Sequence, residues 1–169
     1  AFYFPTRHTH RLLVLNKSSW VIFFAAPFTQ QVDPATKQIS VTYRQRLESL
    51  WTAIESKGHR VFSAHRREEW GMALETPCVA LAHDQAAIHE ADVLVAYLGT
   101  PLSPGVQLEI GMALEKDLPI VVVRDTHGPC PYLLRADSGH KPFPEVEWND
   151  SLSAEHILQA VREALSSQR

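Results

Sequence analysis

The segment DVLVAYLGTPLSPGVQLEIGMALEKDLPIVVV, residues 92–123, indicates the fold class of this 169-residue chain. It contains two apolar runs, at 92–98 and 118–123, whose continuous apolar character is typical of buried strands. Between them, a turn rich in proline and glycine leads into a helix expected at 104–116, where a proline suits the first position. A strand, a helix and a second strand in this order predict a βαβ unit with parallel strands.

The same alternation continues on both sides of this unit. Further strands are expected at 20–26, 60–64 and 146–148, and further helices at 40–57, 77–90 and 151–167. The pattern predicts a single-domain α/β fold, with a doubly wound, mainly parallel five-stranded sheet of the flavodoxin or Rossmann-like type and helices on both faces. Residues 20–169 would form this domain, and residues 1–19 an N-terminal extension or an edge strand.

The composition excludes several classes of protein. Hydrophobic residues make up 45% of the chain and charged residues 21%, which argues against a disordered chain or a coiled coil. A net charge of −3 provides no basic footprint for nucleic acid or an anionic membrane, and the longest apolar run, 20–28, is too short to span a bilayer. Two cysteines do not make a disulfide framework, so we expect a reduced, cytoplasmic setting.

Neither a metal ion nor a cofactor is expected. The histidines and cysteines show no spacing typical of metal ligands. The dinucleotide pattern GxGxxG and the phosphate-loop pattern GxxxxGK[ST] are both missing from the sequence.

Glu109 is the most conspicuous candidate for a functional side chain. In a helix it would share one face with four apolar residues, namely Val106, Ile110, Ala113 and Leu114. A charged carboxylate in an apolar stripe costs several kcal/mol unless it is paired. Glu109 is therefore functional, satisfied by a backbone donor or an arginine, or exposed by a slightly different phase of the helix, and its spacing alone leaves these readings open. Since the helix is apolar almost all round, we also expect it to be buried.

The turn at 99–105, directly before this helix, is suited to bind an anion. Small residues such as Gly99 let a ligand approach the backbone, and a helix start offers N–H groups and a favourable dipole. Ser103 can donate to an anion or simply cap the helix.

A charged segment, His65-Arg66-Arg67-Glu68, follows the strand expected at 60–64 and lies in a loop expected at 65–71. Doubly wound sheets bind ligands outside the carboxyl ends of their strands. Two guanidinium groups at this place are suited to recognise a phosphate or a base edge. A solvated run of charges is the alternative.

Three segments resemble one enzyme family. Residues 97–123, which include SPGVQLEIG, resemble the nucleoside 2-deoxyribosyltransferase superfamily, and more closely its nucleoside 5′-monophosphate N-glycosidases. AAPFTQQVDP at 25–34 and AHRREEWG at 64–71 are similar to segments of the CMP and hydroxymethyl-CMP hydrolases in that group. The resemblance implies hydrolysis of the N-glycosidic bond of a nucleoside 5′-monophosphate, with a CMP-like pyrimidine favoured, to free base and (deoxy)ribose 5-phosphate.

The resemblance also implies roles for individual residues. Glu109 would be the nucleophile that forms a covalent glycosyl-enzyme intermediate, and Asp84 a second catalytic carboxylate that assists the leaving base. Ser103 and the N–H groups of Gly105 and Val106 would surround the phosphate. The other substrate-binding candidates are Phe28, which would stack on the base, Arg66 and Arg67, which would recognise the base or phosphate, and the neighbouring Thr29, His65 and Gly99.

The chain departs from the family pattern at two places. Ala25-Ala26 stands where relatives often carry Gly-Gly or Gly-Ser, and Thr29 stands where they tend to carry an arginine. The expected phosphate or base contact therefore lacks one positive charge. Ser103 stands where the nucleoside-level transferases tend to carry an aspartate, which would repel a phosphate, whereas serine can donate to one.

The resemblance implies an oligomeric state and leaves two alternative functions open. Because members of the family are commonly dimers or larger, with sites near subunit interfaces, it implies a homodimer or a larger homo-oligomer. A transferase that moves the sugar between bases would use the same Glu109. A non-catalytic nucleotide-binding module would use the same strand ends, with Glu109 as a structural residue.

Overall fold

The computed structural model describes residues 17–135 and 143–167. Most of the extension or edge strand expected at 1–19 lies outside the described residues, and residues 17–19 form no strand. Within the described ranges, no helix is both long and apolar enough to cross a membrane.

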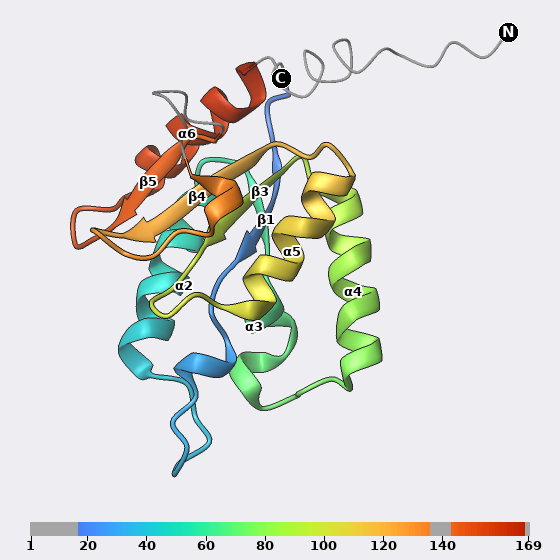
Figure 1. The fold of residues 1–169 in the computed structure, drawn as a ribbon, viewed down its shortest axis with the longest axis vertical. Coiled ribbons are helices and arrows are strands. Elements are labelled where there is room, and N and C mark those ends of the chain that lie inside the picture. Colours follow the sequence, from blue (N-terminus) through green and yellow to red (C-terminus); the bar gives the residue numbers. More distant parts are fainter. Residues whose placement is uncertain (1–16, 136–142, 168–169) are drawn as a thin grey trace, which may run out of the picture.

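A parallel sheet forms the centre of the described molecule (Figure 1). Its strands are β1 (Val21–Ala25), β2 (Arg60–Phe62), β3 (Val93–Tyr97), β4 (Ile120–Asp125) and β5 (Glu145–Trp148). They lie in the order β2-β1-β3-β4-β5, and every neighbouring pair is parallel. This is the flavodoxin order, so the predicted doubly wound fold is confirmed, with a fully parallel sheet in place of a mainly parallel one.

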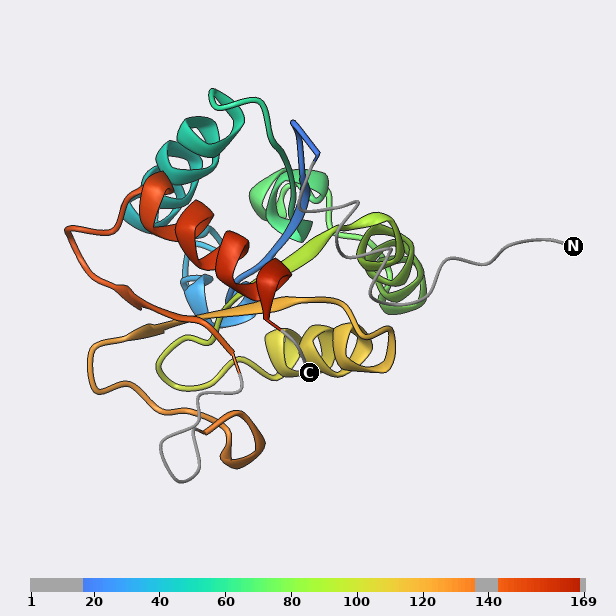
Figure 2. The same cartoon turned by 90° about the horizontal axis from the view of Figure 1, so that it is seen from above.

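Two pairs of helices cover the two faces of the sheet (Figure 2). One face carries α2 (Val41–Glu55) and α6 (Ala154–Ser166), and the other α4 (Pro77–Glu90) and α5 (Pro104–Glu115). Side chains alternate along each strand. Phe24 of β1 therefore packs in the core under α2 and α6, whereas Phe23 packs in the core under α4 and α5.

Serine and proline residues set the starts of these helices. The side chains of Ser40 and Ser103 accept backbone N–H groups at the starts of α2 and α5. Ser153 and His156 form a reciprocal capping box at the start of α6. Pro77 occupies the first turn of α4, because a proline there needs no N–H partner and its fixed φ suits a helix.

The predicted loop at 65–71 is wrong. This segment forms a one-turn helix, α3 (Ala64–Arg67), followed by a 3-10 turn, η2 (Glu69–Gly71). Ser63 starts α3 because its hydroxyl accepts the N–H of His65 at 3.1 Å. A single helical turn is too short to show a hydrophobic period, so its residues read as an irregular charged loop.

The expectation that α5 is buried all round is also wrong. Val106, Ile110 and Ala113 face the sheet and are buried, but Leu108 is 57% exposed and Leu114 is 39% exposed. Two leucines of α5 are therefore exposed to solvent in a single chain, beside polar residues of the same helix such as Gln107 and Glu115.

Candidate active site

The candidate residues gather around the carboxyl ends of β1, β2 and β3. The chain leaves β1 toward α2 on one face of the sheet and leaves β3 toward α5 on the other. Because β1 and β3 are neighbours, this is the switch point at which doubly wound sheets bind their ligands.

Glu109 lies on α5, beside the buried stripe of that helix, and its own side chain is half-buried. The pKa of Glu109 is raised to about 8, chiefly by burial and then by the negative charge of Asp84, while the positive charge of Arg67 opposes the rise. Glu109 therefore ionises near pH 8, and the ionised form is the one that a nucleophilic role requires.

Arg67 connects the carboxyl groups near Glu109. Its guanidinium donates to three carboxylates: Asp84 at 2.8 Å, Glu75 at 2.9 Å and Glu68 at 3.3 Å. We call Arg67, Glu68, Glu75, Asp84 and Glu109 the carboxylate cluster. Since three carboxylates accept from a single guanidinium, the cluster favours a positive charge on a bound molecule.

The turn between β3 and α5 places Ser103 at the start of the helix. Ser103 is buried, and its oxygen accepts the N–H of Val106 at 3.5 Å, which leaves its hydroxyl hydrogen available to a ligand. Gly105 is exposed in the first turn of α5. Gly99 has a φ of +77°, and a Cβ there would lie 2.5 Å from Cγ of Pro27, so this position requires glycine.

His65 holds the loop after β1 in place. It is 1% exposed, and its Nε2 donates to the Pro27 carbonyl at 3.0 Å, while Nδ1 lies 3.3 Å from the Ser63 hydroxyl. Burial lowers the pKa of His65 to about 4, so the ring is neutral at physiological pH. Tyr43 donates to the same carbonyl at 2.9 Å. His65 thus contributes to the site by positioning Pro27 and Phe28, whose ring centroid lies 4.8 Å from its own.

Arg66 points away from the carboxylate cluster. Its guanidinium donates to Glu48 and Glu55 of α2, each at 2.8 Å, and lies 5.0 Å from the ring centroid of Trp51. The structure therefore does not bring Arg66 together with Glu109, and its expected contact with substrate has no support in this arrangement. The two arginines diverge because consecutive helical residues point about 100° apart.

Phe28 and Thr29 lie at the carboxyl end of β1, where η1 (Thr29–Gln31) begins. Phe28 is half-buried against the core, and Thr29 is exposed. The neighbouring Gln30 donates to the Leu102 carbonyl at 3.1 Å, so this segment contacts the turn before α5. Gln30 was not among the predicted site residues, because an isolated glutamine in a polar loop carries no pattern.

Comparison with solved structures identifies the family. BlsM, known from its solution structure, matches with a TM-score of 0.74 and 33% identity, over 88% of this chain and 94% of BlsM. The chain belongs to the nucleoside 2-deoxyribosyltransferase-like superfamily. It lies close to the CMP N-glycosidases within that superfamily, so the expected family is confirmed.

Two further structures were matched at lower similarity. The CMP N-glycosidase BcmB of Clostridium botulinum shares the fold, with a TM-score of 0.56 and 24% identity over 83% of this chain and 97% of BcmB. A 2-deoxyribosyltransferase of Bacillus psychrosaccharolyticus aligns with 67% of this chain and 78% of its own, at 17% identity and a TM-score of 0.49. No family model and no curated protein matches the sequence.

Glu75 belongs to the carboxylate cluster but was not among the predicted site residues. Besides accepting from Arg67, it lies 2.6 Å from Nδ1 of His83. The one signal for it was its position two residues before Pro77, where a helix start favours a negative charge.

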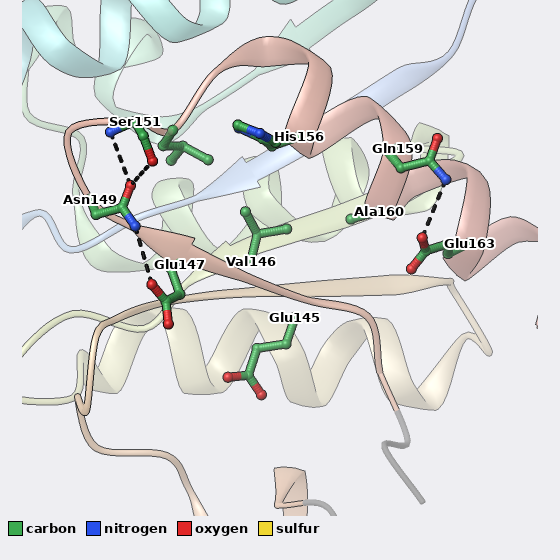
Figure 3. A pocket seen from close by; sticks show the side chains of 10 residues that line it. Glu145, Val146, Glu147, Asn149, Ser151, His156, Gln159, Ala160 and Glu163 are labelled. Carbon is green, nitrogen blue, oxygen red and sulfur yellow. Dashed lines mark hydrogen bonds between the residues drawn. The ribbon is translucent and has the colours of Figure 1, made fainter.

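A separate cavity of about 320 Å³ lies between β5 and α6 (Figure 3). Its lining includes Glu147 and Glu163, and these carboxylates accept hydrogen bonds from Asn149 and Gln159 of the same cavity. None of the predicted site residues lines it.

We place the candidate active site of this superfamily member at the carboxylate cluster, because its titratable groups lie near the switch point of the sheet. Across the described residues, no group of His, Cys, Asp and Glu side chains is placed to hold a metal ion.

Proposed function

We propose that this protein hydrolyses the N-glycosidic bond of a nucleoside 5′-monophosphate, with a CMP-like pyrimidine favoured, and releases free base and (deoxy)ribose 5-phosphate. The observation that carries the proposal is Glu109, a half-buried carboxyl group with a pKa of about 8 that is coupled to Asp84 and Arg67. Membership of the superfamily supports the class of reaction.

In the proposed reaction, ionised Glu109 attacks the anomeric carbon of the sugar. The new bond to the carboxylate oxygen forms as the C–N bond breaks, and the base leaves with the electron pair of that bond. Asp84 would carry a proton to the leaving base. Water then attacks the same carbon and breaks its bond to Glu109, while the proton that the water loses passes to Asp84 and replaces the one given to the base. This restores the Glu109 carboxylate and yields the sugar 5-phosphate.

The carboxylate cluster suits the transition state of this reaction. An oxocarbenium-like transition state carries positive charge on the sugar ring. The carboxylates of Glu68, Glu75 and Asp84 outnumber the single guanidinium between them, so they lower the energy of that charge.

Ser103 provides the argument for a phosphate on the substrate. Its hydroxyl can donate to an anion, and the dipole of α5 favours negative charge at the same place. The Ser103→Asp variant should keep the helix cap but repel a phosphate. We expect the ratio of kcat/KM for CMP to kcat/KM for cytidine to fall by about tenfold or more.

The matched control for this variant is Ser153→Asp, because Ser153 caps α6 away from the cluster. It should leave the ratio unchanged. An unchanged ratio in Ser103→Asp itself would show that the phosphate assignment is wrong.

The reaction is tested by chromatography of the base released from a panel of ribonucleotides, deoxyribonucleotides and their nucleosides. Release from one or two monophosphates would support the hydrolase. If release required an added free base, the protein would be a transferase of the same superfamily. Binding of a nucleotide without release under either condition would support a non-catalytic module.

We also propose that the protein is a homodimer or larger homo-oligomer that uses the outer side of α5. Leu108 and Leu114 are exposed there, and Tyr132 and Leu133 of η3 (Tyr132–Leu134) are more than 80% exposed. Leu134 belongs to the same buried cluster as α5, so η3 lies on that side of the sheet. Light scattering after size exclusion should show more than one chain, and Leu108→Glu with Leu133→Glu should yield monomers. A monomeric wild type would overturn this proposal.

A further inference from the structure

The loops after β3 and β4 are packed tightly against each other. At Gly128, which follows β4, a Cβ would lie 2.9 Å from the Asp125 carbonyl oxygen and 3.2 Å from Oγ1 of Thr100. The N–H of Gly128 donates to that same carbonyl at 2.7 Å. The end of β4 therefore lies directly against the turn that leads to Ser103.

Asp125, the last residue of β4, bonds to this turn with its side chain. Its carboxylate accepts the Thr100 hydroxyl at 2.6 Å and the Tyr97 hydroxyl at 3.0 Å. Tyr97 is itself fixed, because its ring stacks on Trp148 at 4.3 Å between centroids. The carboxylate thus ties the turn to two strands of the sheet.

Other contacts hold the far end of the turn. The N–H of Ser103 donates to the Leu98 carbonyl at 2.9 Å, and Gln30 donates to the Leu102 carbonyl. Because the hydroxyl hydrogen of Thr100 is used by Asp125, Ser103 is the hydroxyl residue of this turn that can donate to a ligand.

We propose that Asp125 is a positioning residue for substrate binding: it holds the turn at 99–103 so that the Ser103 hydroxyl and the first N–H groups of α5 meet the substrate phosphate. The inference rests on the proposed function and deepens it. Asp125 acts through Thr100 and does not touch the reacting atoms. It lies apart from the contacts that hold Asp84 and Glu109, so the chemical step should be spared when it is changed.

The Asp125→Ala variant removes the hydrogen bond to Thr100 of the turn and the hydrogen bond to Tyr97 of β3. We expect its KM for CMP to rise about tenfold while its kcat stays within about threefold of wild type, and its KM for cytidine to change little. Thr100→Ala should reproduce this pattern. Asp125→Asn should restore the KM, because its amide can accept from Tyr97 and donate to Thr100.

Asp92→Ala is the matched structural control. Asp92 accepts from Lys17 and the Val21 N–H at the amino end of the sheet, so its loss should lower the melting temperature and leave the KM for CMP unchanged. A merely structural Asp125 would behave in the same way, with a lower melting temperature and equal effects on CMP and cytidine. That result would overturn the proposal.

Binding separates this inference from the proposed reaction. Calorimetric titration with CMP is carried out in the Glu109→Gln background, where turnover is blocked. If wild type releases no base but Asp125→Ala weakens CMP binding, the reaction is wrong and the positioning role stands. If CMP binds equally well with and without Asp125→Ala, or does not bind at all, the positioning role is wrong.

Discussion

Glu109→Gln should lose turnover by on the order of 10³-fold or more, and the same variant should be more stable than wild type at pH 8. The first effect arises because an amide cannot supply the attacking carboxylate. The second arises because wild type must hold an ionised carboxyl group in a half-buried place at that pH, whereas the amide stays neutral. Base release by chromatography and melting by calorimetry measure the two effects on the same samples.

The sign of the stability effect follows from proton binding. The pKa of Glu109 is about 8 in the folded protein and near 4.5 in the unfolded chain, so the folded state holds more protons between these values. The unfolding free energy of wild type therefore falls as pH rises through this window, by about 1.4 kcal/mol for each unit that separates the two pKa values. The unfolding free energy of Glu109→Gln does not fall in this way, because its amide does not ionise. Its melting temperature should exceed that of wild type by on the order of 10 °C at pH 8, and the difference should vanish near pH 4.5.

Glu115→Gln is the control, because Glu115 lies on the same helix and is exposed. It should change neither turnover nor the pH dependence of melting. A Glu109→Gln variant that keeps near wild-type turnover would exclude the covalent mechanism. One that loses turnover but melts like wild type at every pH would show that Glu109 ionises normally in the folded protein.

The fold was predictable because its signals are local. The apolar runs of β1, β3 and β4 are continuous, since parallel strands between two helical layers are buried on both sides. Their alternation with helices leaves few topologies, and the flavodoxin order is one of them. The exposure of Leu108 and Leu114 was not predictable, because an apolar residue gives the same signal whether its own chain or another covers it.

The candidate site was predictable only in part. Glu109 was found because a carboxylate breaks an apolar stripe, which is a signal within one helix. The separate roles of Arg66 and Arg67 were hidden because their partners are distant in sequence. Glu48 and Glu55 hold Arg66 from α2, whereas Asp84 reaches Arg67 from α4. Asp125 lies beyond the strand expected at 118–123 and carried no signal of its own, since its bond to Thr100 exists only once β3 and β4 are paired.

Asp84→Asn should move the pH profile of the reaction to lower pH. Only ionised Glu109 attacks, so kcat/KM of wild type should rise with pH and level off above about pH 8. The charge of Asp84 raises the pKa of Glu109, and removing that charge also leaves Arg67 with less negative charge to balance. Both changes favour the ionised form of Glu109, so the rising limb should shift toward acid.

The height of the plateau tests a second role of the same residue. If Asp84 carries a proton to the leaving base, Asp84→Asn should lower the plateau by about a hundredfold, because an amide cannot do so. Glu90→Gln removes a charge from the exposed end of the same helix, and it should leave both the limb and the plateau in place. A lower plateau with an unmoved limb would mean that Asp84 acts on the base without influencing Glu109. If the rising part of the kcat/KM profile shifted to lower pH while the plateau kept its wild-type value, Asp84 would act only by raising the pKa of Glu109. It would then carry no proton to the base.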